Sequence, residues 1–343
     1  MSKISSLVRC NIATLIPYST ARDEYDGPLG IFLDANESPY QNGYNRYPDP
    51  HQAQLKDRLS QIKKVPARNI FIGNGSDEAI DLVYRVFCEP GRDNAVLMAP
   101  SYGMYGVAAA INDIGIRQVM LEEDFTLDTE KLLSACDSKT KVLFLCSPNN
   151  PSGNAFPKEQ LLDICGRFPG IVVVDEAYAD FSSAGSLTPD AVRLENLIVL
   201  QTLSKARAMA GLRIGLAISS EEIIRLMSIV KYPYNISRAA TEKALQLLEK
   251  PIDVEVDTII RERGRLASVL KSFPFVKKLF PSEANFLLVR VDDADALYDY
   301  LLEKGIIVRN RSRVRGCEGC LRITVGLPEE NEAIINALKN YHA

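Results

Sequence analysis

The stretch TLSKARAMAGLR at residues 202–213 combines a lysine and an arginine in positions that could do chemistry. It follows the apolar run LIVLQ at 197–201, so we expect Lys205 just after a buried strand. Burial would lower the proton affinity of its amine and make it a better nucleophile toward carbonyl carbon. Arg213 could return to the same pocket and bind an anion. The competing interpretation is a lysine that points to solvent and an arginine in an ordinary ion pair.

A glycine-containing motif, GNGSDEAI at residues 73–80, comes after an apolar run and opens an expected helix. Free amides at a helix N-terminus bind anions, and the hydroxyl of Ser76 could add to them. Ser76 or Asp77 as an ordinary helix cap is the alternative. Because the motif lacks GxxxxGK[ST], it does not indicate a nucleoside triphosphate site.

Two further motifs follow strand-like runs. In VVVDEAY, Asp175 ends a buried run, where a carboxylate is costly unless it meets a positive or protonated group such as a pyridine nitrogen. A helix cap or a magnesium ligand is the alternative reading of Asp175. In SPNNPSG, the amide of Asn150 could donate to a phenolate oxygen. Turns of this composition are also common without any function.

Arginines follow two apolar runs near the C-terminus. Arg322 stands between Leu321 and Ile323 in CLRITVG, so its side chain should point away from the apolar face of a strand. Arg309 follows GIIV and has the same character. A bidentate contact with a carboxylate or phosphate would explain either residue, and an ordinary solvent-facing position is the alternative.

Size and composition exclude several classes of protein. A chain of 343 residues is too long for one ordinary core and predicts two domains. With a net charge of −4 and no long basic run, we expect neither a nucleic-acid nor a membrane partner. Seven cysteines without an even framework indicate reduced thiols and the cytoplasm. With only two histidines and a single CxxC, the sequence predicts no metal site and no histidine-based triad.

The order of the expected elements predicts an α/β fold. Short apolar strands alternate with helices up to about residue 235, which is typical of a parallel sheet that binds ligands at the carboxyl ends of its strands. The pattern after that point is mixed α+β, including an expected strand GIIVR. We therefore predict an N-terminal arm at 1–39, a large domain at 40–235 with a mostly parallel sheet flanked by helices, and a smaller α+β domain at 236–343.

SPNNPSG, VVDEAY, TLSKARAMAGLR and CLRITVG, in this order and spacing, resemble the fold-type I pyridoxal-phosphate aminotransferases over nearly the whole chain. The resemblance implies that Lys205 binds the cofactor covalently and moves the substrate proton, and that Asp175 keeps the pyridine ring protonated. It implies that Tyr178 assists Asp175 and Lys205 in catalysis. The residues implied to bind pyridoxal 5'-phosphate are Gly75, Ser76, Asp77, Tyr102, Asn150, Asp175, Tyr178, Thr202, Ser204, Lys205, Arg213 and, toward the other subunit of a homodimer, Tyr47. Those implied to bind substrate are Tyr18, Asn36, Arg309 and Arg322.

LDANESPY, NRYPDP, GNGSDE, PSYGMY and LIPYSTAR resemble the branch of that family that acts on histidinol phosphate. This resemblance implies a cytoplasmic homodimer of histidine biosynthesis that interconverts L-histidinol phosphate and 2-oxoglutarate with imidazole-acetol phosphate and L-glutamate. A related decarboxylase of threonine phosphate and an aminotransferase of aromatic or other amino acids stay open as alternatives. A regulator that only binds the cofactor is disfavoured because the chain keeps all the catalytic motifs, and a dehydrogenase because GxGxxG is missing.

Overall fold

The computed structural model describes residues 4–20 and 30–341, so parts of the predicted arm (1–3 and 21–29) and residues 342–343 lie outside the described chain. The chain divides into two compact units. Unit 1 comprises Met1–Asp93, Ala108–Gly115 and Leu187–Pro251, and unit 2 comprises Asn94–Val107, Ile116–Ser186 and Ile252–Ala343. The predicted domain boundaries near residues 39 and 235 stay a prediction.

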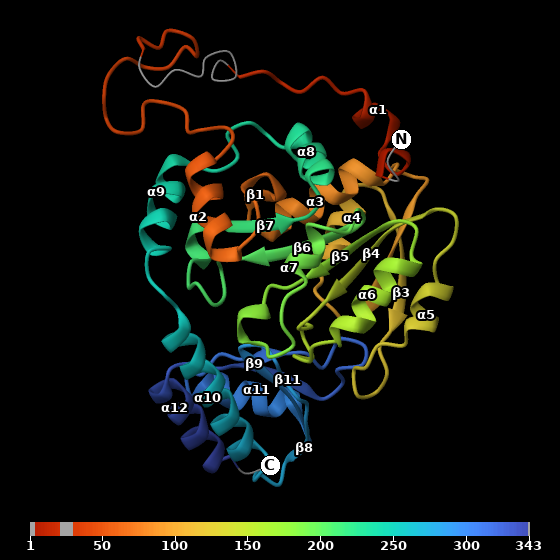
Figure 1. The fold of residues 1–343 in the computed structure, drawn as a ribbon. Helices are drawn as coiled ribbons and strands as arrows, with labels where there is room; N and C mark the ends of the chain where they lie inside the picture. The colour runs from red at the N-terminus through yellow and green to blue at the C-terminus, as the bar shows by residue number, and fades with distance from the viewer. Residues whose placement is uncertain (1–3, 21–29, 342–343) are drawn as a thin grey trace. The chain divides into compact units, whose positions relative to one another are not determined.

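Unit 1 is built around three strands (Figure 1), which lie in the order β1-β7-β6. Its α-helices and strands are α1 (Cys10–Ala13), α2 (Ala53–Lys63), β1 (Ile70–Asn74), α3 (Ser76–Phe87), α7 (Thr188–Ala191), β6 (Leu197–Thr202), β7 (Ile214–Ile218), α8 (Glu221–Val230) and α9 (Arg238–Leu247). Every residue of β6 and β7 is buried, as their unbroken apolar sequences predict. The polar residues after β6 therefore start from a rigid, buried element.

The direction of β7 departs from the predicted parallel arrangement, because β7 runs antiparallel to both β1 and β6. A parallel neighbour needs a crossover of a dozen or more residues, usually with a helix between the strands. Residues 203–213 between β6 and β7 contain only the 3-10 turn η4 (Ala210–Leu212), so the chain turns back on itself. This return brings Arg213 next to the end of β6.

Unit 2 holds four further strands in the order β5-β4-β2-β3, of which β2, β4 and β5 pair in parallel as predicted. Between them run the helices of the first part of unit 2. These elements are β2 (Asn94–Ala99), α4 (Met104–Ile111, whose second half falls in unit 1), β3 (Gly115–Met120), α5 (Thr129–Ser134), β4 (Thr140–Cys146), α6 (Lys158–Arg167) and β5 (Ile171–Asp175).

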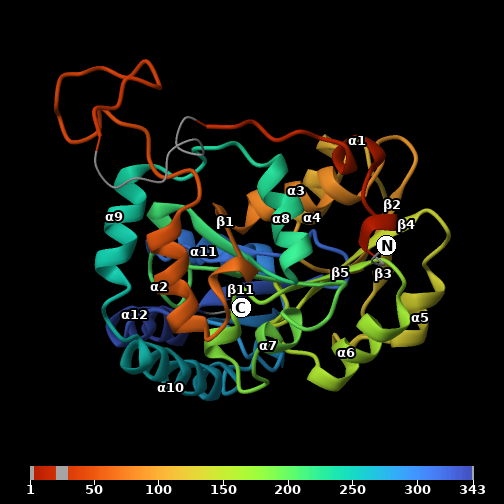
Figure 2. The same ribbon diagram turned by 45° about the horizontal axis from the view of Figure 1, so that its top comes forward.

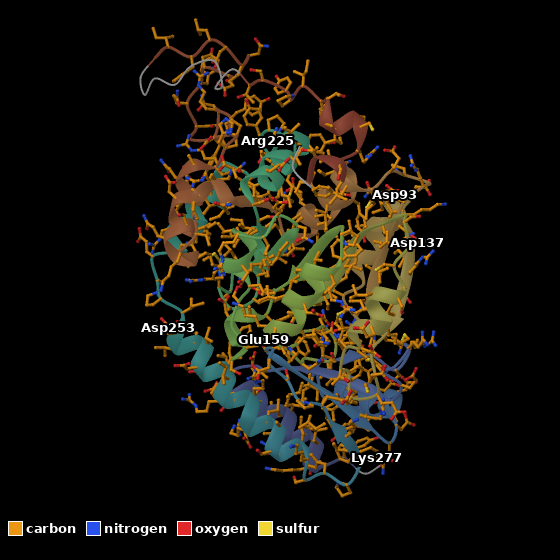
Figure 3. The ribbon with its side chains drawn as sticks, turned by 45° about the vertical axis from the view of Figure 1, so that its right-hand side comes forward. Asp93, Asp137, Glu159, Arg225, Asp253 and Lys277 are labelled. Carbon is orange, nitrogen blue, oxygen red and sulfur yellow. The ribbon has the colours of Figure 1, made fainter. Side chains whose placement is uncertain are left out.

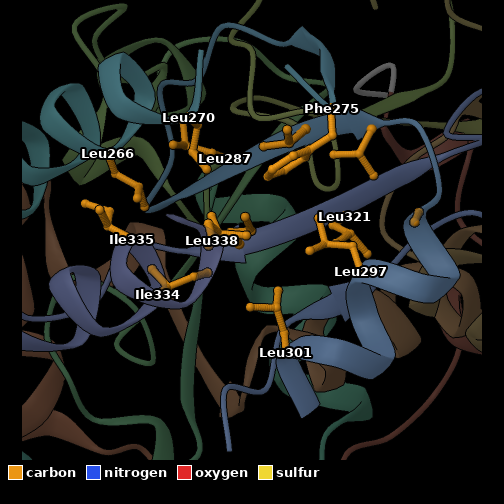
Figure 4. Close-up of a cluster of buried hydrophobic side chains, with 14 residues drawn as sticks. Leu266, Leu270, Phe275, Leu287, Leu297, Leu301, Leu321, Ile334, Ile335 and Leu338 are labelled. Carbon is orange, nitrogen blue, oxygen red and sulfur yellow. The ribbon is translucent and has the colours of Figure 1, made fainter. Parts of the chain in front are cut away.

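The rest of unit 2 is a four-stranded sheet in the order β10-β11-β9-β8. Its elements are α10 (Asp253–Leu270), β8 (Val276–Leu279), β9 (Phe286–Val291), α11 (Ala294–Glu303), β10 (Arg309–Asn310), β11 (Cys320–Thr324) and α12 (Pro328–Lys339). One face of the sheet packs on these helices: Leu287 and Leu321 meet Leu266, Leu297 and Ile335 in one apolar cluster (Figure 4). Alternate residues of the strands therefore point to the opposite face.

Two details of the predicted element order differ from the structure. The expected strand GIIVR is reduced to β10, because residues 306–308 make no ladder and only Arg309 and Asn310 pair with β11. The sequence analysis did not identify β3, α5 or α8. β3 (sequence GIRQVM) has only one buried residue, so it lacks the apolar run that marked the other strands.

The chain before α2 is extended in part. Residues 30–48 contain no helix or strand, and Figures 1 and 2 show this segment looping away from α2 and α9 within unit 1. It carries large exposed apolar side chains, including Ile31 (90% exposed), Leu33 (89%) and Tyr40 (83%). No helix within the described residues combines the length and apolar character needed to cross a membrane.

Candidate active site

In unit 1, the start of α3 and the return loop before β7 lie against each other. Gly75 precedes α3 with φ of 74° and caps it without a side-chain hydrogen bond, so the amides of Ser76 and Asp77 are not used by a capping side chain. The amide of Gly75 donates to the carbonyl of Arg213 at 2.7 Å. The glycine-containing motif thus lies at a helix N-terminus, where backbone donors and the helix dipole favour negative charge, and its role as an anion site stays a prediction.

The guanidinium of Arg213 lies over this helix end. A Cβ placed on Gly75 would come within 2.6 Å of Arg213 Nη2, so the side chain and the glycine are in direct contact. Arg213 also contacts Asp77 at 3.5 Å and donates to Ser204 Oγ at 3.5 Å. The Ser204 amide donates to Thr202 Oγ1 at 3.1 Å. One cation, two hydroxyls and the backbone amides of a helix N-terminus converge here, and a phosphate binds to donors of this kind.

Gly215 makes this convergence possible, because a Cβ there would lie 2.0 Å from the backbone nitrogen of Ser76. We expect Gly215→Ala to push β7 and the start of α3 apart, since the obstacle is backbone rather than a flexible side chain. The expected result is a loss of stability of about 1–3 kcal/mol, typical of overpacking, and a larger loss of anion binding. Gly211→Ala is the matched control, because no atom lies within 4 Å of its added Cβ. Thermal melting with and without pyridoxal phosphate measures both effects, and equal behaviour of the two variants would contradict the prediction.

Lys205 follows β6 as predicted, but the residue is exposed in this chain, so its expected burial is wrong. The physical reason is the position of the lysine. The buried strand ends at Thr202, and the chain then turns outward, with the amide of Ala208 donating to the Lys205 carbonyl at 3.0 Å. The amine therefore stands on the same short loop as the Ser204 hydroxyl.

In unit 2, Asp175 ends β5 and is buried, as predicted. Tyr105 donates its hydroxyl to Asp175 Oδ2 at 2.7 Å, and the Ala177 amide donates to Oδ1 at 3.0 Å. Burial, and then the charge of Asp175, raise the pKa of Tyr105, so this phenol stays protonated and donates. Asp175 is thus held by two neutral donors.

Asn150, Tyr178 and Arg322 gather around Phe286 in the same unit. Arg322 donates through Nη1 to Asn150 Oδ1, and its guanidinium lies 5.2 Å from the centre of the Phe286 ring. Tyr178 meets the same ring edge-on at 5.2 Å. Burial raises the pKa of Tyr178 and lowers the pKa of Arg322. The predicted turn residue and the predicted strand arginine are therefore neighbours, although they are 172 positions apart in the chain.

Tyr102 and Arg309 complete the predicted residues of unit 2. Tyr102 packs edge-on against Tyr105 with ring centres 5.6 Å apart, and Arg309 lies directly opposite Arg322 in the β10–β11 ladder. Ser152 is buried and bridges Asn149 and Asn154 by hydrogen bonds, so its hydroxyl supports the turn rather than a ligand.

Three residues of unit 1 that were predicted to bind cofactor or substrate lie away from residues 202–213. Tyr47 stacks on Tyr234 with ring centres 4.4 Å apart, and the two line a cavity of about 470 Å³ that also includes Asn36. Tyr18 is 75% exposed and borders a different cavity of about 360 Å³. In the described chain, no hydrogen bond or ring contact joins the side chains of Tyr18, Asn36 or Tyr47 to residues 202–213.

Sequence reasoning missed several residues that hold these groups in place. Tyr105 is one of them: it lies in α4, whereas its neighbour Tyr102, the aromatic residue of the matched motif, precedes that helix. Asn235 was also missed; it donates to Glu78 and to the Ile72 carbonyl, and so fixes the turn from β1 into α3. No pattern in the sequence signals such a contact, because its partners lie about 160 residues away.

Comparison with known proteins agrees with this geometry. The family described as aminotransferase class I and II matches residues 31–338. The histidinol-phosphate aminotransferase of Parabacteroides distasonis is 54% identical over 342 residues, covering 99% of each chain. The enzyme of the same name from Bacteroides thetaiotaomicron is 48% identical over 344 residues, again covering 99% of each.

Solved structures share the fold. The histidinol-phosphate aminotransferase from Clostridium acetobutylicum superimposes with a TM-score of 0.79 at 25% identity, covering 86% of this chain and 90% of that one. The structure of the Sinorhizobium meliloti protein of that name, in complex with pyridoxal-5'-phosphate, gives 0.77 at 24% identity, covering 85% and 82%.

Proposed function

The chain belongs to the class I and II aminotransferases, and on that premise we propose that it transfers an amino group between L-histidinol phosphate and 2-oxoglutarate. The products are imidazole-acetol phosphate and L-glutamate, and the reaction serves histidine biosynthesis. The observation that carries this proposal is the 54% identity, over 99% of both chains, to a histidinol-phosphate aminotransferase. The cofactor is pyridoxal 5'-phosphate.

The residues present fit this cofactor. Its phosphate matches the amides of Ser76 and Asp77 and the side chains of Thr202, Ser204 and Arg213, and a primary amine stands on the same loop at Lys205. Because Gly75 has no Cβ, the Arg213 guanidinium can lie directly against the helix end, where an anion would meet both. When bound, pyridoxal phosphate takes up the electron pair released as a proton leaves the Cα of the amine substrate.

We assign the remaining work to side chains of the protein. Lys205 holds the cofactor covalently and carries the proton to and from the substrate Cα. Asp175, which accepts hydrogen bonds from Tyr105 and the Ala177 amide, keeps a proton on the pyridine nitrogen. Tyr178 and Asn150 donate to the phenolate oxygen, and Tyr102 lies on the ring face.

Arg322 is assigned to the anionic group of both substrates. Arg322→Ala should raise KM for glutamate and for histidinol phosphate at least tenfold, because a lost charge-assisted hydrogen bond costs about 1.5–3 kcal/mol. Steady-state kinetics with each substrate is the measurement. Lys277→Ala on β8 of the same sheet is the control. Lys277 (labelled in Figure 3) pairs with Asp292 at 2.8 Å, and its substitution should leave both KM values unchanged. A rise in KM for only one substrate would show that the two anions do not share this arginine.

We further propose that the enzyme is a cytoplasmic homodimer. The segment at 30–48 carries apolar side chains of which 80–90% is exposed, and an apolar surface of this kind is typical of an interface. A second subunit on this segment would cover Ile31 and Leu33. Tyr47, Asn36 and Tyr18 could then contribute to the active site of that subunit. Light scattering should give twice the mass of the 38.0 kDa chain, and deletion of residues 1–34 should reduce it to one chain.

One comparison of amino donors tests the proposed substrate. Purified holoenzyme is assayed for amino transfer from L-histidinol phosphate, L-phenylalanine and L-threonine phosphate to 2-oxoglutarate, and for release of carbon dioxide from L-threonine phosphate. We expect the highest kcat/KM with histidinol phosphate and no carbon dioxide. A decarboxylase or an aromatic aminotransferase would reverse one of these outcomes.

A further inference from the structure

One face of the four-stranded sheet of unit 2 packs on the apolar cluster, and the other, which we call the basic face, carries arginines beside the buried Phe286 and Leu288. In β11, Leu321 and Ile323 enter the core, so Arg322 points to the other side. Arg309 lies directly opposite Arg322 in the ladder. Arg311 comes two residues later, and its amide donates to the Cys320 carbonyl at 2.9 Å, which continues the pairing. Arg309, Arg311 and Arg322 therefore share the basic face.

Other cations of this sheet have partners within the protein. Lys277 pairs with Asp292, and Arg290 donates to the carbonyl of Glu318 at 3.1 Å. Lys278 lies 4.7 Å from the centre of the Phe280 ring. By contrast, Arg309, Arg311 and Arg322 form no ion pair with any carboxylate of the described chain. An anion from outside would supply the counter-ion that these three neighbouring positive charges lack among the described carboxylates.

Arg311 is the member of this group whose position most needs an explanation. Its side chain is half-buried, and its Nε atom is buried without a hydrogen-bond partner. Burial lowers the pKa of Arg311, and the charges of Arg322 and Arg309 lower it further. A buried donor that stays unpaired is costly, and so is a guanidinium held against two others. Such an arrangement persists where a ligand relieves both costs.

We propose that Arg311 is a third arginine of the substrate anion site and sets its preference for a phosphate over a carboxylate. The inference rests on the proposed function, in which Arg322 binds the anionic group of both substrates and Arg309 lies beside it. A carboxylate carries one negative charge and two oxygens, which a pair of arginines satisfies. A phosphate monoester carries about −1.5 to −2 charge at pH 7 and three free oxygens, so it gains from a third guanidinium.

Substitution of Arg311 tests this role against a matched neighbour. Arg313 lies in the same segment, carries the same charge and is exposed, so Arg313→Gln is the control. In Arg311→Gln, KM for histidinol phosphate should rise at least tenfold, KM for glutamate less than about threefold, and kcat should change little. Equal effects in the two variants would overturn the inference. So would an equal rise in KM for both substrates, because that is the result expected of a structural role.

A binding measurement separates this inference from the proposed function. Inorganic phosphate is titrated calorimetrically into the holoenzyme, in which the cofactor already occupies its own phosphate site. Arg311→Gln should weaken this binding at least tenfold relative to the wild type and Arg313→Gln. If the wild type fails to use histidinol phosphate, the proposed function is wrong, yet this titration still decides the role of Arg311.

A conservative variant covers the case in which Arg311→Gln does not fold. Arg311→Lys keeps the charge and loses the planar fork, so it should melt near the wild-type temperature and bind phosphate more weakly than the wild type. Unchanged phosphate affinity in this variant, together with unchanged KM for histidinol phosphate, would also overturn the inference.

Discussion

Replacing Lys205 with alanine should leave a folded protein that transfers almost no amino groups. The side chain is exposed on the loop after β6, so its removal creates no cavity and should change stability by less than about 0.5 kcal/mol. Proton transfer by a positioned base contributes about 10²–10⁴-fold to a rate, and the variant also loses the covalent bond to the cofactor. We therefore expect kcat to fall by about 10⁴-fold or more.

Lys243→Ala is the control for this experiment, because Lys243 is an exposed lysine on α9 of the same unit. Borohydride should abolish the visible absorption of the wild-type holoenzyme by reducing the bond between cofactor and lysine, and peptide mapping should then find the cofactor on Lys205. Lys243→Ala should give the same map and full activity. A label on another lysine, or an alanine variant within tenfold of wild-type kcat, would refute the assignment of Lys205.

The sequence predicted the positions of the chemical groups better than their surroundings. The ends of β5 and β6 were predictable because each strand is an apolar run that ends in polar residues. Asp175 ends such a run, so it lies at the carboxyl end of its strand. The helix end at Gly75 was predictable for a similar reason, since glycines before a helix have few structural alternatives.

Other features depend on contacts between residues far apart in the chain. β7 runs antiparallel to β6 because the connection between them contains no α-helix. Its apolar sequence would suit a strand of either direction. Tyr105 bonds to Asp175 across 70 positions, and Arg322 bonds to Asn150 across 172. The exposure of Lys205 depends on how the loop leaves the strand. Local periodicity carries no information on any of these.

Arg311 shows the same limit at the basic face. In the sequence, Arg309 follows an apolar run and Arg322 interrupts one, which marks both as candidates. Arg311 does neither. Only the ladder of β10 and β11 places it beside them, and only the burial of its Nε atom marks it as unsatisfied. The arginine that we propose to decide substrate preference therefore carries no recognisable pattern in the sequence.

Asp175→Asn should bind pyridoxal phosphate and yet lose more than about a hundredfold in kcat. Asparagine has the same shape as aspartate, and its carbonyl oxygen can still accept from Tyr105 or the Ala177 amide, so the change removes charge with little effect on packing. A single charge-assisted hydrogen bond is worth about 1.5–3 kcal/mol, or roughly 10- to 150-fold. The effect should exceed that bond because a ring nitrogen without its proton accepts electrons poorly during proton removal.

Tyr105→Phe is the variant that distinguishes this role of Asp175 from a structural one. It removes the neutral donor to Asp175 Oδ2 and keeps the carboxylate charge, so kcat should fall by no more than about tenfold. Single-turnover rates of both variants, measured with saturating cofactor, give the comparison. If Asp175→Asn and Tyr105→Phe lose the same activity, Asp175 acts through the local hydrogen-bond network, and the protonation of the ring must be maintained by another group.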